Sequence, residues 1–174
     1  MKQFKYFNII NFIKISDILT LANAACGLLS IFFAIQQNFR LSALFIFIAM
    51  IFDYLDGKAA RLLKKQNEFG KQLDSLCDAI SFGAAPAVLG YNYGLNSWYA
   101  IVILVFYLLC GILRLARYNI TSLDHFEGLP ITTGGFIIVV LSLFVPFNVY
   151  TSQILAAYII ASLLMISSIP VKKI

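Results

Sequence analysis

Acidic side chains within strongly apolar runs are the residues of this chain best suited to do chemistry. Four aspartates between positions 53 and 78 make up half of its eight acidic residues. They are Asp53, Asp56, Asp74 and Asp78. An unpaired Asp at the centre of a membrane helix costs at least about 2.5 kcal/mol, so four of them would cost on the order of 10 kcal/mol. Bound divalent cations would offset that cost, so these residues predict a metal centre.

Helical periodicity arranges the four carboxylates in two pairs. At about 100° per residue, Asp53 and Asp56 share one face of one helix, and Asp74 and Asp78 share one face of the next. If these helices form an antiparallel hairpin that turns near Gln66, Asp53 comes level with Asp78 and Asp56 comes level with Asp74. Four hard oxygen ligands at one depth favour one or two ions such as Mg²⁺, Mn²⁺ or Ca²⁺. Two divalent ions would bring the formal charge of the cluster to zero.

Small residues and one arginine surround the predicted metal centre. Gly57, Ala60 and Gly70 are of the type that permits close helix packing in membranes, which is their structural alternative. Beside a metal centre, such residues also leave room for a ligand to approach the backbone. Arg61 lies one turn beyond Gly57 and is placed to donate hydrogen bonds to a phosphate. Its alternative role is a charge that only sets the membrane topology.

The composition of the chain identifies a polytopic membrane protein. Hydrophobic residues make up 61% of the chain, charged residues make up 12%, and the mean hydropathy is +0.88. We predict an all-α fold in which residues 17–174 form one domain of six transmembrane helices. The apolar runs of spanning length are Ile18–Gln36, Leu41–Leu63, Leu73–Tyr93, Trp98–Arg117, Ile131–Phe147 and Gln153–Ile169. Residues 1–16 interleave aromatic, Ile, Lys and Asn residues, which favours an amphipathic helix at the membrane surface over a poorly ordered basic leader.

Basic residues fall almost entirely on one side of these predicted helices. Of the thirteen Lys and Arg residues, only Arg40 falls on the opposite side. Because positively charged connections stay in the cytoplasm, both termini and the acidic cluster are predicted to face the cytoplasm from the cell membrane. The net charge of +5 therefore indicates membrane topology and attraction to anionic membrane lipids, with no nucleic-acid partner.

The acidic segment resembles the signature of the CDP-alcohol phosphotransferases. Every position of the pattern D-x2-D-G-x2-A-R-x8-G-x3-D-x3-D is filled, by Asp53, Asp56, Gly57, Ala60, Arg61, Gly70, Asp74 and Asp78. The resemblance implies that the four aspartates hold two divalent ions, Mg²⁺ or Mn²⁺, which bind the pyrophosphate of a CDP-linked lipid. It also implies that the small residues and Arg61 line the nucleotide site, that Asp78 is the general base, and that the protein is a homodimer.

Polar residues outside this signature resemble further positions of the family, and those near the acceptor resemble the phosphatidylserine synthase branch. They are Thr20 and Asn23 near the nucleotide, and Arg114, Arg117, Thr132 and Thr133 near the acceptor. Two guanidinium groups one turn apart would suit the carboxylate of serine, with anchoring at the cytoplasmic surface as the alternative. The two threonines could bind the amine or hydroxyl of the acceptor. Alternatively, one of them could be a helix N-cap. The polar pair near the nucleotide could instead only hold helices together.

These residues predict an enzyme that transfers a phosphatidyl-type group from CDP-diacylglycerol, or its ether-lipid equivalent, to the hydroxyl of L-serine and releases CMP. Glycerol-3-phosphate or an inositol phosphate is the alternative acceptor, because a phosphorylated alcohol would also suit two arginines. A divalent-cation transporter is the alternative of another class. Transport has no need of the small residues and the arginine around the aspartates, and no second acidic site is evident in the other predicted helices.

Overall fold

The computed structural model describes residues 15–62, 68–120, 126–144, 151–168 and 170–171. These residues are largely helical, as predicted. The helices are α1 (Ile15–Ile35), α2 (Phe39–Leu62), α3 (Glu68–Asp78), the π-helix η2 (Ala79–Ala84), α4 (Ala85–Asn92), α5 (Trp98–Ile120), α6 (Ile131–Phe144) and α7 (Thr151–Ile166). Two short strands, β1 (Phe126–Glu127) and β2 (Pro170–Val171), pair antiparallel and were not predicted. The amphipathic helix predicted for residues 1–16 lies outside the described residues, except that Ile15 and Ser16 begin α1.

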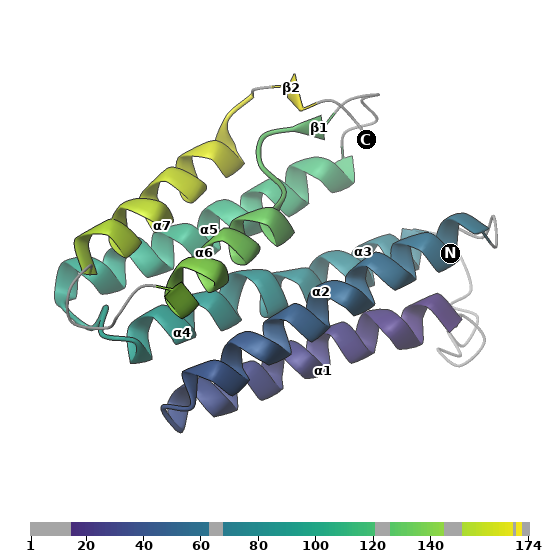
Figure 1. Ribbon diagram of the computed structural model, residues 1–174. Helices are drawn as coiled ribbons and strands as arrows, with labels where there is room; N and C mark the ends of the chain where they lie inside the picture. The colour runs from purple at the N-terminus through teal and green to yellow at the C-terminus, as the bar shows by residue number, and fades with distance from the viewer. Residues whose placement is uncertain (1–14, 63–67, 121–125, 145–150, 169, 172–174) are drawn as a thin grey trace, which may run out of the picture.

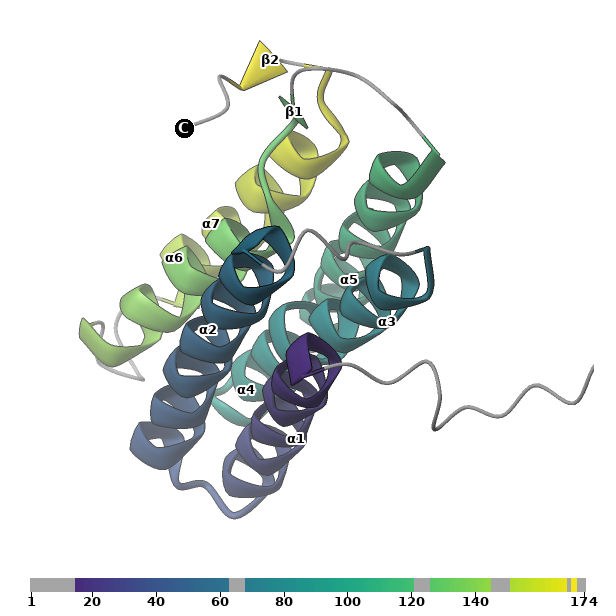
Figure 2. The same cartoon turned by 90° about the vertical axis from the view of Figure 1, so that its right-hand side faces the viewer.

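The helices form one bundle with a continuous central helix made of α3, η2 and α4 (Figures 1 and 2). The central helix packs against α1 on one side and against α5 and α6 on the other. The start of α1, the end of α2, the start of α3 and the ends of α5 and α7 lie at the same end of the bundle (Figure 1). We call this end the basic end, because Lys58, Arg61, Lys71, Arg114 and Arg117 belong to the helix segments there, whereas Arg40 begins α2 at the opposite end.

Three of the described helices are long and apolar enough to cross a membrane. They cover Ser16–Ile35, Glu68–Asn92 and Trp98–Ile120. The helices α6 and α7 are also apolar but shorter. The helix α2 has 24 residues and carries the charged residues of the acidic segment in its second half. The protein is therefore a helical membrane protein, and the charges of α2 interrupt a run that otherwise resembles the long spans.

A three-residue connection, residues 36–38, joins α1 to α2 and makes them an antiparallel pair. Gln37 adopts the left-handed conformation with φ of 59°, and the N–H of Asn38 donates to the Phe33 carbonyl at 2.9 Å, which closes the end of α1. The Asn38 side chain then accepts a hydrogen bond from the N–H of Leu41 at 3.3 Å. This contact satisfies a free N–H in the first turn of α2, so the turn ends one helix and begins the next.

The π-helix η2 begins directly after the last aspartate of the signature. Pro86 has no N–H, so the carbonyl of Phe82, four residues earlier, lacks its α-helical donor. The Tyr107 hydroxyl of α5 donates to that carbonyl at 2.8 Å. The Tyr158 hydroxyl of α7 donates to the carbonyl of Pro86 at 2.6 Å. The two tyrosines therefore attach the irregular part of the central helix to α5 and α7, and wide turns of this kind often occur at functional sites.

Candidate active site

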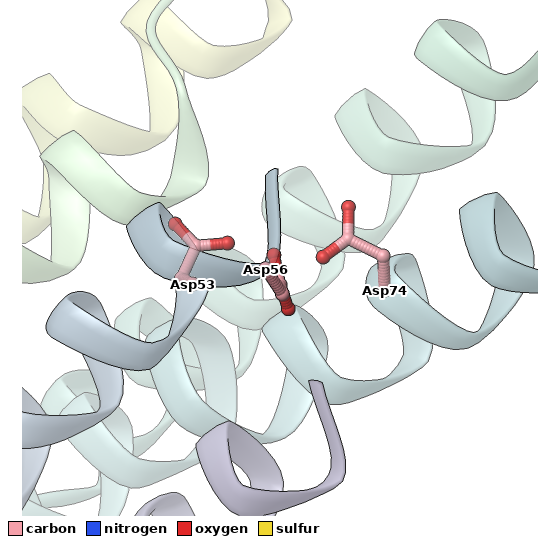
Figure 3. Close-up of side chains that lie close together, drawn as sticks. All are labelled: Asp53, Asp56 and Asp74. Atoms are coloured by element: carbon pink, nitrogen blue, oxygen red, sulfur yellow. The ribbon is translucent and has the colours of Figure 1, made fainter. Parts of the chain in front are cut away.

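The acidic side chains of the signature converge between α2 and α3. Carboxylate oxygens of Asp53, Asp56 and Asp74 all lie within 4.8 Å of one another. Figure 3 shows the Asp56 carboxylate between those of the other two residues. Asp78 lies one turn along from Asp74, and its carboxyl group is a hydrogen-bonding neighbour of Asp53. The predicted alignment of Asp53 with Asp78 and of Asp56 with Asp74 is therefore confirmed, while the turn predicted near Gln66 lies outside the described residues.

The two helices that carry these aspartates do not pack directly along each other. The helix α1 packs along α2 and also along α3, whereas the backbones of α2 and α3 make almost no close approach. The carboxylates therefore reach toward one another across the separation between the helices. The helix α1 therefore lies against both helices that carry the aspartates, a neighbour that the spacing of the aspartates did not predict.

Two oxygens of the acidic cluster have no partner among the described residues. Asp56 Oδ2 and Asp74 Oδ1 are buried and accept no hydrogen bond from the described residues. A buried carboxylate oxygen without a partner is costly, whereas carboxylate oxygens are the preferred ligands of hard divalent cations. Asp56 and Asp78 are almost fully buried, at 5% and 6% exposure, whereas Asp53 and Asp74 are partly exposed, so water screens the first two carboxylates poorly. The donor atoms, their spacing and their burial fit a divalent metal centre.

The helix α1 contributes three polar residues to the surroundings of the cluster. Asn23 donates from Nδ2 to Oδ1 of Asp78 at 3.2 Å. Thr20 lies beside Asp56, although its hydroxyl donates to the Ser16 carbonyl at 3.0 Å, and Asp17 interacts electrostatically with Asp56. Thr20 and Asn23 were predicted near the site, whereas Asp17, which is buried, was not. Its position three residues before Thr20, on the same face of the helix, is the signal that could have identified it.

The two threonines of α6 differ in their surroundings. Thr132 is a hydrogen-bonding neighbour of Asp53, which places it at the cluster. Thr133 is exposed. The helix begins at Ile131, so both threonines lie inside its first turn and neither is the N-cap. The structure therefore brings only the first of the two to the acidic side chains.

At least one small residue of the signature, Gly57, does not pack closely against another helix. A Cβ atom added to Gly57 would meet no atom within 4 Å, whereas one added to Gly27 of α1 would collide with the central helix. The space beside Gly57 is therefore open, as a ligand-binding role requires. Arg61 is exposed in the last turn of α2, and Gly70 is half-buried in α3. Ala60 lies in α2, and its side chain is outside the described part of the chain.

The two arginines of α5 have different partners. The Arg117 guanidinium donates to the carbonyls of residues 165–167 at the end of α7, at distances between 3.1 and 3.3 Å. Such contacts satisfy carbonyls that a helix leaves free at its C-terminus. Arg114 is buried, its guanidinium lies 5.7 Å from the centroid of the Tyr118 ring, and it interacts electrostatically with Asp78. Arg114 is thus the arginine associated with the acidic cluster.

Comparisons with known proteins agree with the signature. The family described as CDP-alcohol phosphatidyltransferase matches residues 13–170. The chain is 40% identical over 167 residues to a Methanocaldococcus jannaschii protein named CDP-diacylglycerol–serine O-phosphatidyltransferase, covering 96% of this chain and 78% of the relative. It is 39% identical over 128 residues to a Bacillus subtilis protein of the same name, covering 71% of this chain and 72% of the relative.

A third relative is named for a related product. The chain is 40% identical over 168 residues to the archaetidylserine synthase of Methanothermobacter thermautotrophicus, covering 92% of this chain and 70% of the relative. The family match takes in the acidic cluster and nearly all the helices around it. On this evidence the chain belongs to the CDP-alcohol phosphatidyltransferase family of membrane enzymes.

Proposed function

We propose that this enzyme transfers a phosphatidyl-type group from a CDP-linked lipid to the hydroxyl of L-serine and releases CMP. The observation that carries the proposal is the convergence of Asp53, Asp56 and Asp74 within a chain of this family. The choice of serine is supported by relatives that are named for serine transfer or for archaetidylserine synthesis. The buried guanidinium of Arg114 beside the cluster adds a suitable partner for an amino-acid carboxylate.

Two divalent ions, Mg²⁺ or Mn²⁺, would be held by Asp53, Asp56, Asp74 and Asp78. When bound, these ions would hold the diphosphate oxygens of the lipid substrate and stabilise the negative charge that develops on the departing CMP. The buried oxygens of Asp56 and Asp74, which have no partner in the described part of the chain, support this assignment. The four carboxylates would in turn be stabilised, because each gains a partner that the described residues do not supply.

The protein groups of the proposed reaction have distinct tasks. Asp78 accepts the proton of the serine hydroxyl, and the serine oxygen forms a bond to the phosphorus that bears the lipid. The bond between that phosphorus and the CMP oxygen breaks in the same transfer, so no covalent enzyme intermediate is needed. Arg114 binds the serine carboxylate, and Thr132 donates a hydrogen bond near the acceptor. The nucleotide occupies the open side of Gly57, with Arg61 beside its phosphates and Gly70 opposite.

We also propose that the bundle crosses the cell membrane six times, with the basic end in the cytoplasm. The positions of the described Lys and Arg residues relative to Arg40 support this orientation. A water-soluble acceptor and the nucleotide would then enter from the cytoplasm, while the lipid tails remain in the bilayer. The surface helix within residues 1–16 and the homodimer stay predictions from the sequence.

The function is tested by measuring CMP release from CDP-diacylglycerol with purified protein, Mn²⁺ and one candidate acceptor at a time. We expect release with L-serine and little with glycerol-3-phosphate or an inositol phosphate. Release with a phosphorylated acceptor alone would overturn the serine assignment and keep the reaction class. No release with any alcohol, together with Mn²⁺ flux into protein-containing vesicles, would favour the transporter.

Arg114→Ala is expected to raise the KM for serine by about tenfold or more, because a buried hydrogen bond to a charged group contributes roughly 1.5 to 3 kcal/mol. The KM for the CDP-lipid should change much less. The matched variant is Arg117→Ala, which removes a guanidinium from the same helix. Arg117→Ala should lower the melting temperature, because the carbonyls at the end of α7 lose their donors, and it should leave the serine KM nearly unchanged. Equal effects of both variants on the serine KM would contradict this division of roles.

Gly57→Ala is expected to raise the KM for the CDP-lipid without loss of stability. The added methyl group meets no protein atom, and Ala favours the helix over Gly by roughly 0.8 to 1 kcal/mol. The melting temperature should therefore stay the same or rise, while the methyl group occupies space that the nucleotide needs. Steady-state kinetics and thermal unfolding in the same detergent check both parts. An unchanged KM would show that the open side of Gly57 does not face the nucleotide.

A further inference from the structure

We infer that Asn23 is a positioning residue for Asp78, which it holds from α1, and that it does not contact the nucleotide. The inference rests on the proposed function, because the residue that it positions is the proposed base. The Asn23 side chain donates from Nδ2 to Oδ1 of Asp78 at 3.2 Å, across 55 residues of sequence. Asn23 is fully buried, at 0% exposure, and Asp78 is exposed by only 6%. The contact therefore forms away from water, where a hydrogen bond to a carboxylate is strong.

The backbone of Asn23 is attached to the same stretch of the central helix. The Ser81 hydroxyl of η2 donates to the Asn23 carbonyl at 3.0 Å. One turn further along α1, a Cβ atom on Gly27 would lie 2.7 Å from the Cα of Ser81, so the two backbones approach closely there. Because Ser81 follows Asp78 by only three residues, α1 holds both the carboxyl group of Asp78 and the backbone just beyond it.

The segment after Asp78 is also held from the other side of the bundle. Tyr107 of α5 donates to the Phe82 carbonyl at 2.8 Å. A Cβ atom on Gly135 of α6 would lie 3.3 Å from both the Cβ and the carbonyl oxygen of Phe82. The π-helix is thus fixed by α1, α5 and α6 at once. The remaining freedom of Asp78 is rotation of its side chain, and the Asn23 amide restricts that rotation by holding one carboxylate oxygen.

This restraint has a catalytic consequence. Asp78 lies among three other carboxylates, so its side chain has several alternative partners as soon as cations or substrates bind. Fixing Oδ1 to Asn23 keeps the second oxygen directed at the cluster, where the proton of the acceptor is to be taken. Hydrogen bonds of this kind to metal-binding or catalytic carboxylates typically contribute 10- to 100-fold to metal affinity or activity.

Packing between helices does not by itself explain why position 23 carries an amide side chain. Asn23 Oδ1 is buried and accepts no hydrogen bond from the described residues, so half of the amide is unsatisfied. An unsatisfied buried acceptor destabilises the fold, and an apolar residue would avoid that cost. The single bond to Asp78 is the contact that the amide provides, which favours the positioning role.

The test compares Asn23→Ala with Ser30→Ala. Ser30 is also a fully buried polar residue of α1, and its hydroxyl pairs with that of Ser42 of α2 at 2.9 Å, away from the acidic cluster. Each variant removes one buried hydrogen bond between α1 and another helix, so both should lower the melting temperature. Only Asn23→Ala is expected to lower kcat, by about 10- to 100-fold, with the KM for the CDP-lipid nearly unchanged.

A second measurement works without turnover. Mn²⁺ should raise the melting temperature of the wild-type protein, and the Mn²⁺ concentration for half of that effect should rise about 10- to 100-fold in Asn23→Ala and stay constant in Ser30→Ala. If the wild-type protein releases no CMP with any acceptor, the proposed function fails, and this titration still decides whether Asn23 orients Asp78. If Asn23→Ala is not recovered folded, Asn23→Ser replaces it, because its short hydroxyl fits the same space and stops short of Asp78.

Two results would overturn the inference. A raised KM for the CDP-lipid with unchanged kcat would show that Asn23 contacts the nucleotide. A kcat and an Mn²⁺ response equal to those of Ser30→Ala would show that Asn23 only joins helices. A fall in kcat together with a weaker Mn²⁺ response, both absent in the control, supports the positioning role.

Discussion

Replacement of Asp78 by Asn is expected to lower kcat for CMP release by about 10²- to 10⁴-fold, which is the usual contribution of a general base. Asn has nearly the same shape as Asp, so the packing of α3 and η2 should be preserved. The amide cannot accept the proton of the serine hydroxyl, and it removes one negative charge from the cluster. Asp53, Asp56 and Asp74 remain within 4.8 Å of one another, so much of the nucleotide binding should persist. Steady-state CMP release and binding of a CDP-lipid, measured on the same preparation, separate the two effects.

The control for this variant is Glu68→Gln. Glu68 is an exposed acidic residue in the first turn of the same helix, so its replacement makes the same change of charge at a distance from the cluster. We expect Glu68→Gln to retain the activity of the wild-type protein. If Asp78→Asn keeps a substantial part of the wild-type kcat, Asp78 is not the base. Asp78 would then be at most a metal ligand.

Removal of divalent cations is expected to lower turnover by at least about 10³-fold, because metal ions contribute several kcal/mol to the stabilisation of developing charge and each 1.36 kcal/mol changes the rate tenfold. Addition of Mg²⁺ or Mn²⁺ to the chelated protein should restore turnover. Chelation should also lower the melting temperature, since the buried carboxylates of Asp56 and Asp74 lose the only partners proposed for their free oxygens. CMP release and thermal unfolding, each with and without EDTA, check the two parts.

The matched variant for this prediction is Asp74→Asn. It is expected to shift the Mn²⁺ concentration needed for half-maximal activity upward by at least about 10- to 100-fold, because loss of a metal ligand should cost no less than a change in the residues that surround one. Glu68→Gln should leave the concentration dependence unchanged. Full activity of the wild-type protein in excess EDTA would refute the metal centre and, with it, the proposed role of the four carboxylates.

The helices and the pairing of the aspartates could be predicted from the sequence because both depend on local spacing. An apolar run of spanning length has few alternatives to a helix in lipid, since every backbone polar group must be satisfied within the segment. The structure accordingly has helices at all six predicted runs, and α1, α2 and α5 begin within three residues of the predicted starts. Spacings of three and four residues put Asp53 with Asp56 and Asp74 with Asp78, and a reversal of the chain aligned the two pairs.

Only the tertiary structure decided which helices pack against one another. In lipid, one apolar helix face is nearly as favourable a partner as another, so the sequence did not indicate that α1 packs along both α2 and α3. The contact between Asn23 and Asp78 depends on that arrangement, as does the separation of Arg114 at the cluster from Arg117 at the end of α7. Spacing along the chain determined which carboxylates share a helix face, and packing between distant helices determined which side chains hold them in place.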